Sequence, residues 1–378
     1  MLKLQQIIIT HFKNYEISSF NFKENVVGIC GLNGKGKTNL LDAIYYCCFT
    51  KSYFSNTDIL NKKFDKDGFR LEAEFEASPN PSEACLSGRQ GGEKSKEEAN
   101  VVAILRPTGK KEILINGSLY EKPALHIGKF PCVFIAPDDI ELITGGSELR
   151  RRYIDTILCQ VDFDYLQNLI IYNKILLQRN SLLKGFAEQG KTDFDLLDIM
   201  DAQIIIPGKY IYEKRRLLLE ELIPLTQNFY DKITGRAEKI EVLYVSLLRE
   251  KPFEDILLKS RPRDLFLQRS SSGIHKDEIS FQLSNQNFKS IASQGQRKSL
   301  LFALKLAAYQ FLKVKKGFSP LLLLDDVFEK LDKQRIQNLL HWVCNENEGQ
   351  VFITDTHKER LLEAFKVIDI NGQIIELE

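Results

Sequence analysis

The eight residues at 31–38, with the sequence GLNGKGKT, constrain the fold of this chain more than any other segment. They follow a short apolar run at 26–30, which predicts a buried strand, and they precede helical apolar spacing at 39–46. A strand, a glycine-rich turn and a helix in this order form the context in which the pattern G-x-x-x-x-G-K-[ST] makes a phosphate-binding loop. The segment therefore predicts a P-loop within an α/β nucleotide-binding domain.

Each residue type in this loop has a physical role. Glycines allow the backbone to curl so that its N–H groups point inward around phosphate oxygens, and the helix N-terminus adds positive potential. Lys37 is expected to reach the β- and γ-phosphates, and the Thr38 hydroxyl is expected to bind Mg²⁺. The predicted nucleotide-binding residues are Gly31, Leu32, Asn33, Gly34, Lys35, Gly36, Lys37 and Thr38.

A pair of aspartates near the other end of the chain complements the P-loop. Four leucines at 321–324 predict a buried strand, and Asp325 and Asp326 follow it directly. A carboxylate at the end of a strand beside a P-loop can hold Mg²⁺, directly or through water. We therefore expect Asp325 to bind Mg²⁺ together with Thr38. Asp326 could orient or deprotonate the attacking water, or it could be a solvated helix cap.

The separation between these two motifs indicates the class of nucleotide-binding protein. Lys37 and Asp325 are 288 residues apart, whereas a compact GTPase or kinase rarely separates them so far. A guanine-specific GTPase should also carry Asn-Lys-x-Asp, and the nearest match, at 61–64, lacks the final aspartate. An ATPase head interrupted by a long insertion fits the spacing, with ATP and Mg²⁺ as cofactors.

The periodicity of apolar residues divides the chain into two lobes. Strand and helix patterns alternate near both ends, whereas residues 147–230 have mostly helical spacing. This predicts an α/β head, with a mixed sheet and flanking helices, and a mostly helical second lobe inserted into it. The predicted boundaries are 1–145 and 276–378 for the head and 146–275 for the insertion. Residues 78–100 are polar and contain proline and glycine, which predicts a mobile loop within the head.

A third motif, Ser293-Gln294-Gly295-Gln296, directly precedes a helical pattern at 297–313. A serine hydroxyl and an unobstructed glycine backbone at a helix N-terminus suit an anion, although an ordinary serine N-cap has the same sequence. The motif lies about 30 residues before the paired aspartates, and in that position it resembles the ABC signature.

Composition excludes several other classes of protein. The chain has 52 Lys and Arg against 51 Asp and Glu, so it is not a strongly basic coat protein, although local cations can still bind nucleic acid. Seven cysteines without a Cys-x-x-Cys pair suit a reducing compartment and predict a cytoplasmic protein without a structural zinc site. No apolar run approaches the roughly 18 residues of a membrane span, so no membrane partner is expected.

Taken together, the motifs resemble the RecF family of bacterial recombination-mediator ATPases, whose ABC-type heads are related to those of SMC proteins. Matching stretches run in family order from residue 2 to about 357. The family usually reads Gly-Pro-His-Arg-Asp-Asp where this chain has Gly-Ile-His-Lys-Asp-Glu at 273–278. The position of the ABC switch histidine falls near Asp355 in this chain, and the nearest histidine, His357, lies two positions later. The matching stretches are FKNY at 12–15, the P-loop, APDD at 136–139, RRRYID at 150–155, LQRNSLLK at 177–184, GIHKDE at 273–278, SQGQ at 293–296, LDDV at 324–327 and LD at 331–332.

The resemblance implies a mechanism in which two heads dimerise around ATP. Ser293 and Gly295 of one subunit, with Gln296 beside them, would cap the γ-phosphate held by Lys37 of the other, and Asp332 would lie at the same seam. The dimer would close on DNA at gaps or at single-strand/double-strand junctions, and slow hydrolysis would release it. The chain would be a weak, DNA-stimulated ATPase with RecR and RecO as partners, and it would support recombinase loading and SOS induction.

Contacts to DNA should come mainly from Lys and Arg against phosphates, and they should therefore be salt-sensitive and mostly independent of base sequence. The candidate DNA-contacting residues are Lys13, Lys51, Arg150, Arg151, Arg152 and Arg179.

Two rival functions are a transporter nucleotide-binding subunit, which would carry Leu-Ser-Gly-Gly-Gln and a shorter helical subdomain, and a nuclease fused to an ABC head.

Overall fold

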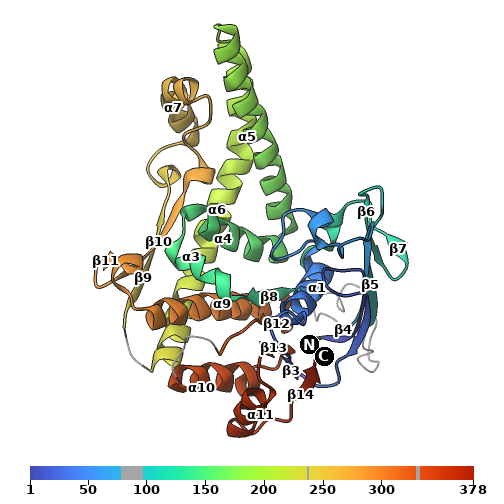
Figure 1. Cartoon of the computed structure of the whole chain (residues 1–378). Coiled ribbons are helices and arrows are strands. Elements are labelled where there is room, and N and C mark those ends of the chain that lie inside the picture. The colour runs from blue at the N-terminus through green and yellow to red at the C-terminus, as the bar shows by residue number, and fades with distance from the viewer. Residues whose placement is uncertain (78–96, 236–237, 329–332) are drawn as a thin grey trace, which may run out of the picture. The chain divides into compact units, whose positions relative to one another are not determined.

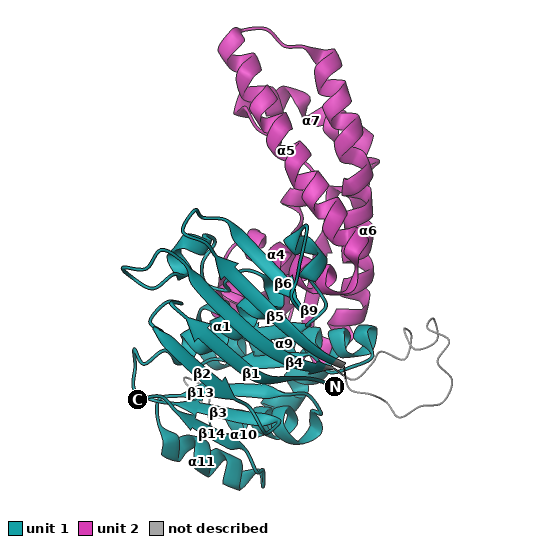
Figure 2. Ribbon diagram, turned by 90° about the vertical axis from the view of Figure 1, so that its right-hand side faces the viewer, with its two compact units in different colours: residues 1–139, 228–236, 294–378 teal, residues 140–227, 237–293 magenta. Residues whose placement is uncertain are grey.

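A computed structural model of the chain describes residues 1–77, 97–235, 238–328 and 333–378. The chain divides into two compact units (Figures 1 and 2). Unit 1, teal in Figure 2, comprises Met1–Asp139, Asn228–Arg236 and Gln294–Glu378, and unit 2, magenta, comprises Ile140–Gln227 and Ala237–Ser293.

A five-stranded parallel sheet forms the centre of unit 1. Its strands are side by side in the order β14-β3-β13-β12-β8, so strands from both ends of the chain are neighbours. Every residue of the four strands other than β14 is buried, as expected for apolar strands covered on both faces. The strands are β3 (Val26–Cys30), β8 (Cys132–Ile135), β12 (Leu321–Leu324), β13 (Val351–Asp355) and β14 (Gln373–Glu376).

A second, antiparallel sheet of six strands lies in the described part of unit 1. Its order is β2-β1-β4-β5-β6-β7, and the burial of β1 alternates because one face packs on the core. Helix α1 (Lys37–Phe49) contacts strands of both sheets and joins them into one apolar cluster. The strands are β1 (Leu2–Thr10), β2 (Ile17–Asn21), β4 (Phe69–Ala77), β5 (Glu97–Leu105), β6 (Lys111–Ile115) and β7 (Ser118–Leu119).

Helices cover the parallel sheet of unit 1. Helix α9 (Gln294–Lys316) packs on β8, and α11 (Lys358–Val367) packs on β3 and β13. Helix α10 (Lys333–His341) continues into a short π-helical turn at Trp342–Glu346. The remaining short elements are 3₁₀ turns at Asp58–Asn61, Pro123–His126 and Pro137–Ile140.

Unit 2 consists of helices and a small antiparallel sheet of order β11-β10-β9. Its two longest helices, α5 and α6, lie side by side in both ribbon views. The helices are α3 (Glu141–Thr144), α4 (Ser147–Val161), α5 (Phe163–Gln189), α6 (Phe194–Thr234), α7 (Phe253–Leu267) and α8 (Phe288–Ile291), and the end of α6, from residue 228 on, belongs to unit 1. The strands are β9 (Ile240–Val245), β10 (Glu278–Leu283) and β11 (Gln286–Asn287), with 3₁₀ turns at Leu247–Arg249 and Ile274–Lys276.

The predicted α/β head with an inserted, mostly helical lobe agrees with this architecture, but the boundaries differ. Residues 276–293, predicted to belong to the head, lie in unit 2 because β10 pairs with β9 along its whole length. The predicted loop at 78–100 falls mostly outside the described residues, and its last four residues are part of β5.

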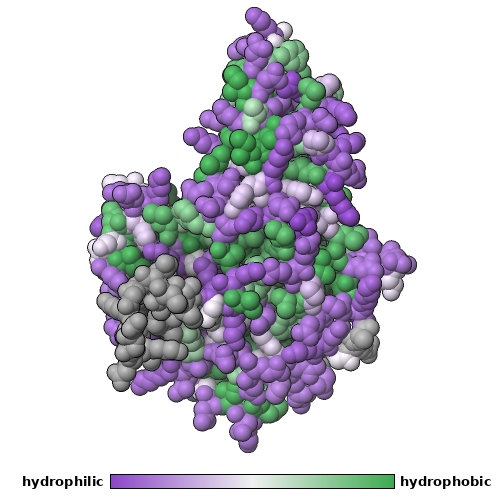
Figure 3. Space-filling model, turned by 180° about the vertical axis from the view of Figure 1, so that it is seen from behind, coloured by the Kyte–Doolittle hydropathy of each residue, from purple (hydrophilic) through white to green (hydrophobic). Residues whose placement is uncertain are grey.

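Hydrophilic residues predominate on the face of the molecule shown in Figure 3, with small groups of hydrophobic side chains between them. Among the helices that the structure describes, none combines the length and the apolar character needed to span a bilayer.

A buried arginine holds three helices of unit 2 together. The Arg179 side chain, from α5, is fully buried, and its Nε donates to Asp201 Oδ1 of α6 at 2.7 Å. Its Nη1 donates to Asp264 Oδ2 of α7, also at 2.7 Å, and to Ser270 Oγ at 2.8 Å. The stretch LQRNSLLK therefore contributes an internal ion pair to unit 2.

The substitution Arg179→Met should lower the free energy of unfolding by about 3–5 kcal/mol, because it leaves the buried Asp264 carboxylate without its cation. Urea unfolding followed by far-UV circular dichroism measures this change. Arg152→Met is the matched control, since Arg152 pairs with Glu148 at the exposed surface of α4 and should contribute less than about 1 kcal/mol. Equal effects of the two substitutions would contradict the assignment.

Candidate nucleotide-binding site

The glycine-rich loop at 31–36 connects the buried strand β3 to the N-terminus of α1, as the sequence predicts. Gly36 has φ of 103°, and a Cβ on it would lie 2.6 Å from Asn14 Nδ2. Gly31 has φ of 150°, and a Cβ there would lie 2.7 Å from the Leu377 carbonyl oxygen. Only glycine fits both positions, so the shape of this turn depends on these two residues.

Lys37 is the first residue of α1, and its side chain folds back over the loop. Its Nζ donates to the Gly31 carbonyl at 2.7 Å and to the Leu32 carbonyl at 3.3 Å. The side chain is 5% exposed, so the ammonium group lies against the inner side of the loop. This is the position from which a P-loop lysine can bind phosphate oxygens.

Two residues from the β1–β2 turn brace the loop from outside. Asn14 Nδ2 donates to the Lys35 carbonyl at 3.2 Å, and the Tyr15 hydroxyl donates to the Gly36 carbonyl at 3.0 Å. Asn39 in the first turn of α1 donates to Asn14 Oδ1 at 2.7 Å. The FKNY stretch at 12–15 matches the family pattern, and its last two residues, Asn14 and Tyr15, support the loop.

Thr38 and Asp325 meet across the sheet, as the sequence predicts. The Thr38 hydroxyl donates to Asp325 Oδ2 at 2.8 Å, although the two residues are 287 positions apart. The Thr354 hydroxyl, from the end of β13, donates to Asp325 Oδ1 at 2.7 Å. A hydroxyl and a carboxylate at this distance form the kind of hard-oxygen pair that Mg²⁺ binds together with phosphate and water. These residues therefore fit a magnesium site.

Burial raises the pKa of Asp325 above its ordinary value. The hydrogen bonds from Thr354 and Thr38 and the charge of Lys37 lower it, whereas the charge of Asp138 adds to the rise. The carboxylate thus lies in a poorly solvated place where a bound cation would stabilise its ionised form.

Asp326 follows Asp325 in an unusual backbone conformation, with φ of 45°. Its N–H donates to Thr354 Oγ1 at 2.9 Å, so the same threonine holds both aspartates. Non-glycine residues at positive φ are uncommon, and they persist where the surrounding structure fixes them. The role of Asp326 in activating water stays a prediction.

The signature residues lie at the start of α9. Ser293 directly precedes this 23-residue helix and is exposed, while Gly295 and Gln296 form its first turn. The Gly295 carbonyl accepts a hydrogen bond from Ser299 Oγ at 2.9 Å. The start of the helix thus lies at the surface, and the role of these residues in binding an anion stays a prediction. Asp332, predicted for the same seam, lies outside the described residues.

The two switch candidates differ in environment. Asp355 is fully buried at the end of β13, and it pairs with Arg360 at 2.7 Å and accepts the His357 N–H at 2.7 Å. The His357 side chain is 69% exposed, and its Nδ1 lies 2.8 Å from Thr356 Oγ1. Asp355 therefore orders the turn, and His357 is the residue whose side chain is accessible.

The candidate DNA-contacting residues also separate by accessibility. Lys51 and Arg152 are exposed. Lys13 pairs with the buried Asp42 at 2.5 Å, and Arg150 is 9% exposed and pairs with Glu278. Arg151 is half-buried and donates to the Asp277 carbonyl at 2.6 Å. Arg179 is fully buried in its ion pairs, so the expectation that it contacts DNA is wrong for this fold.

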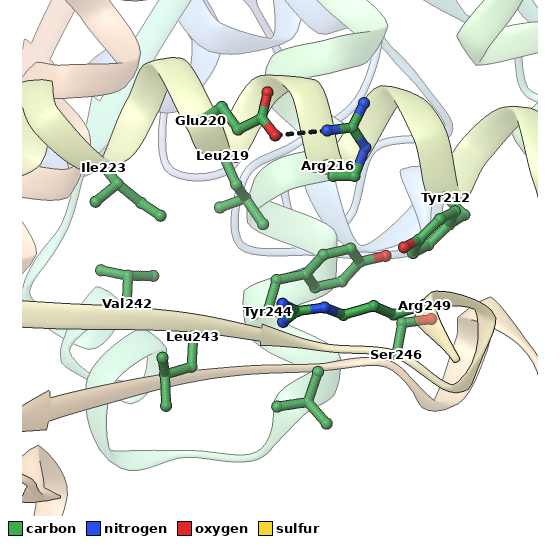
Figure 4. A pocket seen from close by; sticks show the side chains of 11 residues that line it. Tyr212, Arg216, Leu219, Glu220, Ile223, Val242, Leu243, Tyr244, Ser246 and Arg249 are labelled. Carbon is green, nitrogen blue, oxygen red and sulfur yellow. Dashed lines mark hydrogen bonds and ion pairs between the residues drawn. The ribbon is translucent and has the colours of Figure 1, made fainter. Parts of the chain in front are cut away.

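A cavity of about 540 Å³ lies within unit 2, between α6 and β9 (Figure 4). Tyr212 and Tyr244 stack at one side of it with ring centroids 5.9 Å apart, and Arg216 is paired with Glu220. None of the predicted site residues lines it.

Sequence reasoning missed Thr354, which bonds to both aspartates. The available signal was its position at the end of the apolar run 351–353, because polar residues that end neighbouring parallel strands meet at one edge of a sheet.

Comparison with known families agrees with the geometry. The family described as RecF/RecN/SMC N terminal domain matches residues 3–373. The chain is 40% identical over 359 residues to the DNA replication and repair protein RecF of Flavobacterium johnsoniae, covering 95% of each chain. It is 36% identical over 375 residues to the protein of the same name from Parabacteroides distasonis, covering 99% of this chain and 97% of that one.

Solved structures with the same fold include nucleotide complexes. A structure of the recombination mediator protein RecF with ATP, in the RecFOR pathway, has a TM-score of 0.83 and 30% identity over 94% of this chain and 92% of that chain. The RecF-ATPrS structure has a TM-score of 0.84 and 28% identity over 100% of this chain and 96% of that chain. The Smc head domain from Pyrococcus furiosus has a TM-score of 0.52 at 16% identity over 96% of this chain and 92% of that one, which shows the fold alone.

The substitution Thr354→Val should weaken Mg²⁺-dependent nucleotide binding by about tenfold or more, because it removes the hydroxyl that orients Asp325. It should also lower the free energy of unfolding by about 1–3 kcal/mol, since the Asp326 N–H and one oxygen of Asp325 lose their partner. Titration calorimetry with ATP, with and without Mg²⁺, and urea unfolding measure the two effects. Thr356→Val, two residues along, is the matched control, and an equal loss of binding in both variants would contradict the role of Thr354.

Proposed function

The chain belongs to the RecF/RecN/SMC N terminal domain family, and from that premise we propose that it is an ATP-dependent DNA-binding protein of DNA repair and replication. The observation that carries the proposal is the 2.8 Å hydrogen bond between Thr38 and Asp325, which unites the P-loop with the acidic strand end. The family match favours this function over a transporter subunit or a nuclease.

ATP binding follows from the geometry of the loop. The N–H groups of residues 31–38 and the N-terminus of α1 receive the phosphates, and Lys37 compensates their negative charge. Thr38 and Asp325 hold Mg²⁺, which neutralises charge on the phosphate oxygens when it is bound. Asp326 is assigned the role of orienting the attacking water. Because such a switch is expected to hydrolyse ATP slowly, no stronger general base is required.

Dimerisation around ATP supplies the switch. Ser293 and Gly295 are at the accessible N-terminus of α9, where a γ-phosphate held by Lys37 of a second copy can accept their hydrogen bonds. Gln296 is assigned to the same contact, and Asp332 to the seam beside it. ATP binding then shifts the population from separate heads to closed pairs, and hydrolysis reverses the shift.

DNA binding is assigned to the closed pair. The formal net charge of +1 offers little general attraction, so local cations must contact the phosphates. Lys51 and Arg152 are retained as candidates because they are exposed, whereas Lys13, Arg150 and Arg151 are less accessible and are held by partners within the protein.

The cellular role follows by analogy with relatives. The structures of RecF are described as parts of a RecFOR pathway, which supports RecR- and RecO-like partners for this chain. Binding at gaps or single-strand/double-strand junctions, support for recombinase loading and SOS induction, and a cytoplasmic location complete the proposal.

Two substitutions separate ATP binding from dimerisation. Ser293→Arg should keep ATP binding and abolish ATP-dependent dimers, because it adds bulk to the surface that meets the second copy. Lys37→Arg should weaken nucleotide-dependent dimerisation, since the guanidinium cannot replace the ammonium group within the loop. Size-exclusion chromatography with light scattering, with and without ATP, measures the dimers. Loss of ATP binding in Ser293→Arg, or a Lys37→Arg protein that dimerises like wild type, would contradict the shared site.

The affinity for duplex DNA in the presence of ATP should fall as salt rises, with a linear relation between log affinity and log salt concentration. Lys51→Ala and Arg152→Ala should each reduce the slope by about one if the residue contacts a phosphate. Fluorescence anisotropy at several salt concentrations measures the slope, with Lys239→Ala, another exposed cation, as control. A slope near zero for the wild type would overturn the phosphate-contact model.

A further inference from the structure

Lysine is rarely buried, yet two lysines are buried in the part of the chain that the structure describes. One is Lys37 of the P-loop. The other, Lys305, lies in the middle of α9, and it is 7% exposed. Burying an ammonium group costs free energy unless its three N–H donors are hydrogen-bonded. The acceptors around Lys305 therefore show which segments its side chain connects.

Lys305 connects α9 to two other segments. Its Nζ donates to the Phe134 carbonyl of β8 at 2.9 Å and to the Tyr53 hydroxyl at 2.9 Å. It also pairs with Asp139 Oδ2 at 3.0 Å. The three donors are thus directed at β8, the turn that follows it, and the segment after α1.

Asp139 is held by the same group of residues. The Tyr53 hydroxyl donates to Asp139 Oδ1, and the Ala136 N–H donates to Oδ2 at 2.8 Å. The Tyr53 ring also stacks on Phe134 with centroids 4.5 Å apart and an angle of 12° between the rings. The turn after β8 is therefore fixed by both hydrogen bonds and ring packing.

The network continues into the P-loop helix through Asp42, which is fully buried on α1. Asp42 Oδ1 accepts the Tyr53 N–H at 2.7 Å, and Oδ2 accepts the Ser52 hydroxyl at 2.7 Å. Lys13 pairs with Oδ2 at 2.5 Å. Asp42 is one helical turn after Thr38, so the polar network joins the first part of α1 to α9.

Each segment of the network leads to a part of the nucleotide site. Helix α1 begins with Lys37, and the turn after β8 contains Asp138, whose charge acts on Asp325. Helix α9 begins beside Ser293, about three helical turns before Lys305. Buried polar networks that are fully satisfied are rigid, because every alternative arrangement leaves a buried charge without its partner.

We infer that Lys305, Asp139 and Tyr53 are positioning residues that set the orientation of the signature helix α9 relative to the P-loop helix α1. The inference rests on the proposed function, since it assigns these residues to the shared nucleotide site of the dimer. Their effect is on how α9 presents Ser293 and Gly295 to a second copy, whereas ATP binding by a single copy depends on the loop and on the magnesium residues Thr38 and Asp325.

The test compares ATP binding with ATP-dependent dimerisation in matched variants. Lys305→Met keeps the length of the side chain and removes its donors, and Tyr53→Phe removes one hydroxyl and keeps the ring stack. Both variants should bind ATP within about threefold of wild type, and dimerisation should weaken by about tenfold or more for Lys305→Met and by less for Tyr53→Phe. Lys313→Met is the control, because Lys313 lies on the same helix and pairs with the exposed Glu348.

Fluorescent ATP-analogue titration measures binding, and sedimentation equilibrium with ATP measures the dimerisation constant of folded protein. A merely structural role would lower the midpoint of thermal unfolding and leave that constant unchanged, and this result would overturn the inference. Loss of ATP binding in the milder Tyr53→Phe variant would overturn it as well. Failure of the wild type to dimerise with ATP would instead reject the proposed function, so the two failures are distinguishable.

Discussion

The parallel pairing of strands from opposite ends of the chain is the constraint on which the site depends. Strand β3, which leads into the P-loop, pairs with β13, and β13 pairs in turn with β12, which ends at Asp325. The register places Ile29 opposite Thr354 and Ile353 opposite Leu324, so the polar residues that follow these strands meet at one edge. Parallel strands need long connections, and here most of one connection folds as a separate unit.

The insertion is stabilised from within, which explains how it can be so long. Arg179 joins α5, α6 and α7, and Arg215 of α6 pairs with Asp155 of α4 at 2.9 Å. Each ion pair has both partners in unit 2. The entropic cost of closing a loop grows only slowly with the length of the loop. A long connection that is folded by its own internal contacts therefore adds little to the entropic cost of pairing β8 with β12.

Local patterns predicted the parts of the site whose chemistry is local. The loop at 31–38 and the strand end at Asp325 were predicted from spacing and apolar runs, and the structure brings them together as expected. The partners of isolated charges were not predictable in the same way. Arg179 and Lys305 look like ordinary surface cations in the sequence, and only packing shows that both are buried and paired. The boundary at 276 was missed because β10 finds its partner β9 more than 30 residues earlier in the chain.

The sequence by itself determined that a P-loop, an acidic strand end and a signature-like helix start exist, because each is encoded by neighbouring residues. Tertiary structure decided which of the charged residues are available to a ligand and which hold the molecule together. Thr354 orients both aspartates, and Lys305 ties α9 to β8 and Tyr53, through contacts that join residues 28 or more positions apart. Burial makes those contacts strong and specific, because a polar or charged group without a partner in a poorly solvated interior is costly. Burial is a property of the whole folded chain, so no single segment of the sequence reveals it.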